Sequence, residues 1–266
     1  MSSIGVFDSG VGGLTVLEAL CSAFPKENFI YLADTARLPY GSKSIETIHA
    51  YLRQNVGYLI NHQVKAVVVA CNSASTALLK YQDSFSIPVF NVIQPGSRLA
   101  VAATKNEKIA VMGTRATVLS QAYPKTINQL NPNISVTQVA TPLLVPLVEE
   151  GWIDDPVTNL IVYRYLSGIL RDGADTLIMG CTHYPALKKA IQKASPPDVT
   201  LIDSNAGVVS DLEAAYASGK IEKPTNVSSE SADLKILCTD LSPRMDELIK
   251  LLLKARQPLS VEHVTL

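Results

Sequence analysis

VVVACNSAS at residues 67–75 and its counterpart LIMGCTHYP at residues 177–185 are the stretches that most clearly indicate the architecture of this chain. In each, a short apolar run ends at a cysteine that small polar residues follow. Such runs are typical of a strand that is buried on both faces of a parallel sheet. The two stretches therefore predict an α/β fold in which Cys71 and Cys181 each stand at the carboxyl end of a strand.

Similar apolar runs alternate with segments of helical period along the whole chain. They predict strands at 4–7, 29–32, 66–70, 89–93, 109–112, 135–140, 176–179, 199–202, 234–238 and 261–266. The segments between them predict helices at about 13–24, 44–62, 73–82, 116–130, 154–171, 185–194, 205–217 and 243–255, and the polar stretch 218–233 predicts an exposed loop. This alternation is typical of βαβ units around a parallel sheet.

The first and second parts of the chain also resemble each other. IGVFDSG at 4–10 matches IAVMGTR at 109–115, at nearly the same spacing that separates the two cysteine stretches. A nearly constant offset with matched strand ends indicates two similar parallel-sheet α/β domains related by a pseudo-twofold axis, with a site in the cleft between them. The predicted boundaries are 1–94 plus 206–266 for the first domain, which the tail completes, and 95–205 for the second.

Composition limits the partners. The chain has 266 residues, 47% of them hydrophobic, and a formal net charge of -1 without any block of like charges. These features argue against nucleic acid or a membrane as partner and favour a small molecule. No secretory signal or long apolar run is evident, so we expect a cytoplasmic protein. The four cysteines form no CxxC pair, and we expect free thiols.

Cys71 and Cys181 are the strongest candidates for chemistry. A free thiol has a pKa of about 8.5, which a following helix N-terminus lowers, so either residue can act as acid or base. A buried cysteine can also be a simple packing residue. We interpret Cys21 in this way because it shares one helical face with Leu17, Leu20 and Phe24, and Cys238 because it ends an apolar strand without a matching partner. If the two halves face each other, Cys71 and Cys181 are opposed and can invert one carbon centre by proton transfer from both sides.

Polar groups near the strand ends suggest helpers for these thiols. Asp8 and Ser9 precede a glycine run, but the third glycine of a dinucleotide-binding fingerprint would fall at Thr15, so we expect the run to approach a carboxylate instead. Glu149 and His183 are candidates to assist a thiol. Cys181 and His183 lack further metal ligands at recognised spacing, and no lysine for pyridoxal phosphate is evident. We therefore expect neither metal nor cofactor.

Five segments together resemble the glutamate racemases of the aspartate/glutamate racemase superfamily. They are FDSGVGG at 7–13, ADTARLPYGSK at 33–43, VACNSAS at 69–75, PLVEEG at 146–151 and GCTHYP at 180–185. The resemblance covers nearly the whole chain. It implies a cofactor-independent isomerase that interconverts L-glutamate and D-glutamate, supplies D-glutamate for peptidoglycan, cell-wall biogenesis and cell shape, and forms a homodimer.

The resemblance also implies the roles of single residues. The thiol that matches Cys71 acts on the D-isomer and the one that matches Cys181 on the L-isomer, and Asp8, Glu149 and His183 assist them. Substrate contacts are implied for Asp8, Ser9, Tyr40, Gly41, Asn72, Ser73, Thr114, Thr117, Thr182 and His183. The family usually has threonine at the position of Ser73, and the hydroxyl group is retained here.

Three other functions remain open at this point. Catalytic thiols alone do not measure the length of a substrate side chain, so a racemase of aspartate or another amino acid fits as well. Cys181 and His183 also suit a nucleophilic hydrolase, although Cys71 would then have no role. A two-lobed amino-acid binding protein would need neither thiol.

Overall fold

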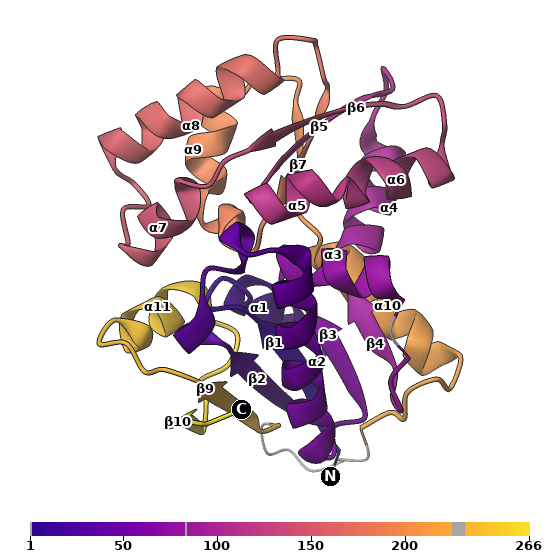
Figure 1. Ribbon diagram of the computed structural model, residues 1–266, viewed down its shortest axis with the longest axis vertical. Helices are drawn as coiled ribbons and strands as arrows, with labels where there is room; N and C mark the ends of the chain where they lie inside the picture. Colours follow the sequence, from indigo (N-terminus) through magenta and orange to yellow (C-terminus); the bar gives the residue numbers. More distant parts are fainter. Residues whose placement is uncertain (1, 83, 225–231) are drawn as a thin grey trace.

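The computed structural model describes residues 2–82, 84–224 and 232–266, and it consists of two stacked α/β halves, each built on its own parallel sheet (Figure 1). The first sheet has the order β10-β9-β2-β1-β3-β4 and the second has the order β6-β5-β7-β8. Every neighbouring pair of strands in both sheets is parallel. The predicted fold class, two parallel-sheet α/β units, is confirmed.

The strands of the first sheet are β1 (Ile4–Asp8), β2 (Phe29–Ala33), β3 (Ala66–Val69), β4 (Val89–Asn91), β9 (Leu234–Cys238) and β10 (Ser260–His263). Those of the second are β5 (Lys108–Gly113), β6 (Ser135–Ala140), β7 (Thr176–Gly180) and β8 (Thr200–Ile202). The order β2-β1-β3-β4 recurs as β6-β5-β7-β8. The internal sequence match therefore pairs β1 with β5 and β3 with β7, at equivalent positions of the two sheets.

Helices cover both faces of each sheet. Around the first sheet lie α1 (Leu14–Ala23), α10 (Asn205–Ala217) and α11 (Met245–Leu252) on one face, and α2 (Ile45–Asn61) and α3 (Asn72–Tyr81) on the other. Around the second lie α7 (Leu144–Glu149), α8 (Pro156–Ile169) and α9 (Lys188–Ala194) on one face, and α4 (Ile93–Ala103) and α6 (Ala122–Leu130) on the other. Short elements complete the chain: α5 (Arg115–Ser120) and the 3-10 turns η1 (Thr35–Arg37), η2 (Tyr40–Ser42) and η3 (Tyr184–Leu187).

Strand side chains alternate between two apolar cores in each half. In β1, Ile4 and Val6 join the cluster under α1 and α10, whereas Phe7 joins the cluster under α2 and α3. This alternation follows from the pleat, which sends successive side chains to opposite faces. Since both faces are covered, the strands are apolar throughout. The cysteines that follow β3 and β7 stand beyond the carboxyl ends of these strands, at the border of the cores under α2 and α3 and under α7, α8 and α9.

The structure differs from the expectation in one strand, in one helix and in two helices that were not expected. The strand expected at 89–93 ends at Asn91, whose side-chain Oδ1 accepts hydrogen bonds from the backbone N–H groups of Ile93 and Gln94 (3.0 and 2.9 Å) and so begins the unexpected helix α4. The helix expected at 116–130 is broken at Gln121, which has a left-handed φ of 56°. Helix α7 was not expected at all, because six residues are too few to display a helical period.

The two segments that cross between the halves are helical. Helix α4 packs against α6 and β7 of the second half, and α10 packs against α1 of the first half and against α4. The domain boundaries at 94/95 and 205/206 fall within α4 and at the start of α10, and they stay a prediction. The loop expected at 218–233 lies partly outside the described residues. Within the described part of the chain, no helix is long and apolar enough to cross a bilayer.

Candidate active site

Both cysteines that end strands face one cavity of about 380 Å³ between the two halves. Cys71 follows β3 and is the N-cap of α3, where its Sγ accepts a hydrogen bond from the backbone N–H of Ala74 at 3.5 Å. Cys181 follows β7 in the equivalent position. The two residues are only 4% and 5% exposed. A small molecule in this cavity therefore meets one thiol from each half.

Most predicted site residues line this cavity. They are Ser9, Tyr40, Gly41, Cys71, Asn72, Ser73, Thr114, Glu149, Cys181, Thr182 and His183. The cavity is also lined by residues that were not predicted, namely Leu38, Pro39, Ser42, Arg115, Pro142, Leu143, Val145 and Pro146. Two predicted residues, Asp8 and Thr117, lie behind the lining rather than in it.

Cys71 sits in surroundings that favour the neutral thiol. Its Sγ–H donates to the Oγ of Ser9 at 3.5 Å. Burial raises the pKa of Cys71 to about 12, the nearby charge of Asp8 adds to that rise, and the hydrogen bonds with Ser9 and Ala74 oppose it. At neutral pH this side of the cavity thus holds a protonated sulfur, which can give a proton but must first lose one to act as a base.

Asp8 acts from behind the lining. It is fully buried at the end of β1, where its carboxylate accepts hydrogen bonds from the backbone N–H of Gly10 (2.9 Å) and from the Oγ1 of Thr182 (3.2 Å). Burial raises the pKa of Asp8, and the charge of His183 opposes the rise. Because Thr182 belongs to the second half, the Asp8 carboxylate connects the loop after β1 with the loop that carries Cys181.

The second thiol has a basic partner. The Nδ1 of His183 lies 3.7 Å from the Sγ of Cys181, and its Nε2 lies 3.2 Å from the Oε1 of Glu149. Burial lowers the pKa of His183, but the contacts with Cys181 and Glu149 outweigh it and raise that pKa to about 10. The imidazole is therefore protonated at neutral pH, and it can stabilise negative charge on the sulfur beside it.

The polar residues around the thiols connect the halves. The hydroxyl groups of Ser73 and Thr114 lie 2.9 Å apart across the boundary. Thr117 is fully buried behind them, and its hydroxyl lies 3.0 Å from that of Thr114. The hydroxyl of Tyr123, in α6 of the second half, donates to the Oδ1 of Asn72 at 2.7 Å. Sequence reasoning missed Tyr123, because nothing in its apolar helical context indicates a polar partner in the other half.

The segment 38–42 forms part of the cavity wall and is held by a buried carboxylate. Asp34 is fully buried and accepts hydrogen bonds from the Nε of Arg37 (2.7 Å), the Nδ2 of Asn55 (3.2 Å), the Oγ1 of Thr239 (2.9 Å) and the hydroxyl of Tyr40. Since these donors come from the loop, from α2 and from the end of β9, three separate elements position Tyr40 and its neighbours.

Arg115 is the second residue that sequence reasoning missed. It is exposed, it lines the cavity, and it makes no hydrogen bond or ion pair with any residue that the structure describes. The available signal was its place directly after Thr114, at the start of a helix that follows a strand. Its guanidinium adds an unpaired positive charge to a cavity whose other charged lining groups, Glu149 and His183, are paired.

These groups suit a proton transfer at one carbon. A thiol stands on each side of the cavity, one protonated and one beside an imidazolium, so that one can accept a proton while the other donates one. No lysine is among the described residues that line the cavity. Among residues 2–82, 84–224 and 232–266, no cluster of three His, Cys, Asp or Glu side chains has the geometry of a metal site.

Comparison with known proteins also identifies relatives that are racemases. Residues 7–212 match the family model Asp/Glu/Hydantoin racemase. The chain is 43% identical over 264 residues to the glutamate racemase of Syntrophus aciditrophicus, covering 99% of this chain and 96% of that protein. It is 45% identical over 225 residues to that of Geobacter metallireducens, with coverage of 84% and 83%.

Solved structures of glutamate racemases also superimpose on this chain. The glutamate racemase isoform RacE1 from Bacillus anthracis superimposes with a TM-score of 0.91 at 35% identity, covering 100% of this chain and 98% of that one. The glutamate racemase from Francisella tularensis, in complex with D-glutamate, superimposes with a TM-score of 0.89 at 34% identity, with coverage of 99% and 97%.

Proposed function

The chain belongs to the Asp/Glu/Hydantoin racemase family, and from this premise we infer that it is a glutamate racemase, an isomerase that interconverts L-glutamate and D-glutamate. The observation that carries this function is the single cavity into which both halves present a thiol, at equivalent strand ends. The proposed mechanism is proton transfer by two bases without a cofactor, and the proposed role is the supply of D-glutamate for peptidoglycan in the cytoplasm.

With L-glutamate, Cys181 acts as the base in the proposed reaction. Its thiolate takes the α-proton, so that the C–H bond breaks, an S–H bond forms and the electron pair passes to the α-carbon and its carboxylate. The thiol of Cys71 then delivers its proton to the opposite face of that carbon. The raised pKa of Cys71 suits this donor role, because the sulfur is protonated before substrate arrives.

With D-glutamate the roles are reversed. The forward reaction leaves Cys181 protonated and Cys71 as the thiolate, which is the state that D-glutamate requires. The Cys71 thiolate then takes the α-proton, and the thiol of Cys181 delivers its proton to the opposite face of the carbon. The imidazolium of His183 stabilises the thiolate of Cys181 when that thiol has given up its proton, and the contact with Glu149 orients the imidazole. Asp8 lies behind the lining, where it accepts hydrogen bonds from Gly10 and Thr182, and its charge acts on the thiol of Cys71. The two thiols thus occupy similar strand ends but unequal surroundings.

The proposal is tested by incubating the enzyme with L-glutamate in heavy water. We expect the optical rotation to decay to zero while deuterium enters only at the α-carbon. The variants Cys71→Ala and Cys181→Ala should each lose racemisation, whereas Cys21→Ala, a buried cysteine outside the cavity, should keep it. Full activity in either cavity variant would refute the two-thiol mechanism.

Aspartate serves as the competing substrate in the same experiment. If deuterium enters aspartate and not glutamate, the substrate assignment is wrong while the mechanism stands. Acyl transfer to Cys181 would instead leave the rotation of both amino acids unchanged. Sedimentation of the purified protein tests the homodimer that the family resemblance supports.

A further inference from the structure

Thr15 stands where the third glycine of a dinucleotide-binding fingerprint would fall, and its side chain makes a contact that a glycine could not make. The half-buried residue lies in the first turn of α1, and its Oγ1–H donates to the carbonyl O of Thr182 at 3.0 Å. Thr182 belongs to the second half and stands between Cys181 and His183. The hydroxyl of Thr15 therefore reaches across the boundary to the loop that carries one thiol and the imidazole beside it.

The carbonyl of Thr182 lacks the donor that a turn normally supplies. In a 3-10 turn a carbonyl accepts from the N–H group three residues further on, and for Thr182 that residue is Pro185, which has no N–H. The next N–H group, of Ala186, donates to the carbonyl of His183 at 3.2 Å. Among the hydrogen bonds of the described residues, the one from Thr15 is the only one that the Thr182 carbonyl accepts.

The hydroxyl of Thr15 has a second acceptor within reach, the carbonyl O of Gly12 at 3.0 Å. That carbonyl already accepts the backbone N–H of Thr15 at 3.1 Å, as at an ordinary helix start. A hydroxyl has one proton to donate, and a buried carbonyl without a donor is costly. The proton of Thr15 therefore serves Thr182, which has no other donor.

Thr182 is held from the first half at two of its atoms. Its Oγ1 donates to Asp8 at 3.2 Å, and its carbonyl accepts from Thr15. Thr15 is in turn held at its own carbonyl, which accepts from the Nδ2 of Asn205 at the start of α10 at 3.3 Å. Since the two contacts lie at different ends of Thr182, they fix its rotation as well as its position.

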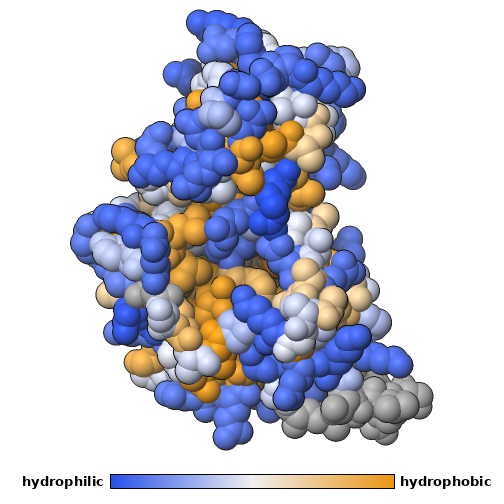
Figure 2. Space-filling model, turned by 90° about the vertical axis from the view of Figure 1, so that its right-hand side faces the viewer, coloured by the Kyte–Doolittle hydropathy of each residue, from blue (hydrophilic) through white to orange (hydrophobic). Residues whose placement is uncertain are grey.

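Such contacts matter because the seam between the halves is not uniformly apolar. Figure 2 shows one side of the molecule, where hydrophilic residues lie beside apolar ones between the two halves. Burial of apolar surface is non-directional, whereas a hydrogen bond restricts both a distance and an angle. The placement of the Cys181 loop against the first half therefore depends on hydrogen bonds such as that of Thr15.

We propose that Thr15 is a positioning residue of the racemase reaction: its hydroxyl holds the loop of Cys181 and His183 where the thiolate reaches the α-proton. This inference rests on the proposed function. Thr15 is not among the residues that line the catalytic cavity, so it acts through Thr182 and not on the substrate. It assists one thiol only, because Cys71 is held within the first half by its own hydrogen bonds.

The inference is tested by α-deuterium isotope effects on kcat/KM in both directions. Thr15→Val keeps the branched shape and removes the hydroxyl, and we expect it to lower kcat about tenfold through a small displacement of Cys181. With deuterated L-glutamate, Cys181 breaks the C–D bond in the step that has become slower, so the isotope effect rises. With deuterated D-glutamate, Cys71 breaks that bond before the slow step, so the isotope effect falls toward one.

Two further variants of Thr15 separate the hydroxyl from the fold. Thr15→Ser keeps the hydroxyl and should restore kcat and both isotope effects to the wild-type values. Thr15→Ala also lacks the hydroxyl, and alanine suits a helix better than a β-branched residue does. It should therefore reproduce the opposite changes in the two isotope effects in a protein that folds.

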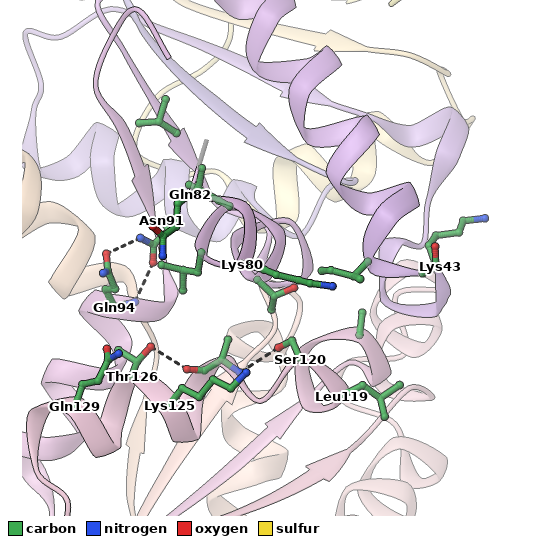
Figure 3. Close-up of a pocket in the computed structure, with 18 of the residues that line it drawn as sticks. Lys43, Lys80, Gln82, Asn91, Gln94, Leu119, Ser120, Lys125, Thr126 and Gln129 are labelled. Atoms are coloured by element: carbon green, nitrogen blue, oxygen red, sulfur yellow. Dashed lines mark hydrogen bonds between the residues drawn. The ribbon is translucent and has the colours of Figure 1, made fainter. Parts of the chain in front are cut away.

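Thr126→Val is the matched control. The half-buried Thr126 also donates its hydroxyl to a backbone carbonyl, that of Ala122 at 2.8 Å, but both residues belong to α6. Thr126 lines a second cavity, of about 1080 Å³, whose described lining residues are all different from those of the catalytic cavity (Figure 3). This variant should keep the wild-type kcat and both isotope effects.

Isotope effects that stay at the wild-type values, or that change in the same direction, in Thr15→Val and Thr15→Ala would overturn the positioning role. A contribution to stability alone would reduce the amount of active enzyme and leave both isotope effects unchanged. The substrate is whichever of glutamate and aspartate the wild type racemises. A wild type that racemises neither refutes the proposed function and with it the role of Thr15, whereas unchanged isotope effects in an active enzyme refute the role of Thr15 alone.

Discussion

Gly12 determines where the imidazole of His183 can lie. A Cβ atom at this position would come within 2.4 Å of the Nδ1 of His183 and 2.6 Å of the Oγ1 of Thr182, both in the other half. Such separations are far shorter than a van der Waals contact of about 3.5 Å. The absence of a side chain at Gly12 is therefore what allows His183 to approach Cys181.

We expect Gly12→Ala to reduce kcat by about a hundredfold, because a displacement of the assisting groups by roughly 1 Å costs that much. Gly57→Ala is the matched control, since nothing lies within 4 Å of its Cβ, and Gly57 lies inside α2. That control should keep full activity and gain about 0.5–1 kcal/mol in the free energy of unfolding. Equal kcat values for the two variants would show that the glycine loop does not position His183.

The raised pKa of His183 links stability to pH. The folded protein holds the proton with a pKa of about 10, whereas an unfolded histidine has a pKa of 6.5. Protonation thus favours the folded state, fully below pH 6.5, and the advantage is lost as the pH rises toward 10. The difference in the free energy of unfolding between wild type and His183→Gln should shrink steadily across this window in urea titrations. A difference that is constant or grows with pH would contradict the proposed charge state.

Arg115 supplies the unpaired positive charge of the cavity, and a dicarboxylate substrate carries net negative charge. We expect Arg115→Ala to raise KM for glutamate by about three- to tenfold with little change in kcat, and the effect to fade as added KCl screens the charge. Arg171→Ala, at an exposed arginine outside both cavities, should leave KM unchanged. An effect of Arg115→Ala that does not depend on salt would argue against steering.

A candidate site residue can be predicted from the sequence when a reactive side chain stands at a recognisable position, such as the end of a strand. Cys71 and Cys181 could be found because a reactive side chain follows an apolar strand twice, in matching contexts. Tyr123 and Arg115 could not, because their importance depends on which residues of the other half they face. That information is absent from local periodicity.

At the scale of elements, the wall of the cavity at 38–42 depends on the network of Asp34. The hydroxyl of Tyr40 donates to Asp34 and accepts from the Nδ2 of Asn55 at 3.1 Å. Tyr40→Phe removes this hydroxyl and leaves a buried carboxylate short of one donor. We expect a loss of about 1–3 kcal/mol in the free energy of unfolding and a higher KM. Tyr163→Phe, at a tyrosine that is 61% exposed, should change neither quantity.

The elements that periodicity predicted well are long or bounded by clear breakers. The strands at 135–140 and 234–238 and the helix at 205–217 have the expected bounds. The wrongly predicted bounds, of the strand at 89–93 and the helix at 116–130, result from single residues that do not change the hydrophobic period. Asn91 turns the chain from strand to helix with one side-chain oxygen, and Gln121 adopts a conformation that usually belongs to glycine.

The hydrogen bond between Tyr123 and Asn72 joins the two halves of the molecule. Removing it tests whether contacts between the halves determine the affinity for substrate. Tyr123→Phe keeps the ring in its core and removes only the hydroxyl that orients Asn72. We expect KM for glutamate to rise several-fold, with a loss of about 1 kcal/mol in the free energy of unfolding. Tyr165→Phe, in α8 and outside both cavities, is the control. An unchanged KM would mean that the halves are positioned by other contacts.

The order of strands in the first sheet has a consequence for synthesis on the ribosome. Strand β9 lies between β2 and β10, yet it follows β2 by roughly 200 residues, which take about 10–40 s to translate. The sheet of the second half is complete once β8 has emerged, so the half that starts first is finished last. Until Leu234–Cys238 arrive, β2 exposes an unpaired edge that can join other chains. Nascent or prematurely ended chains should therefore aggregate through β2, even though every residue of the catalytic cavity has already been made.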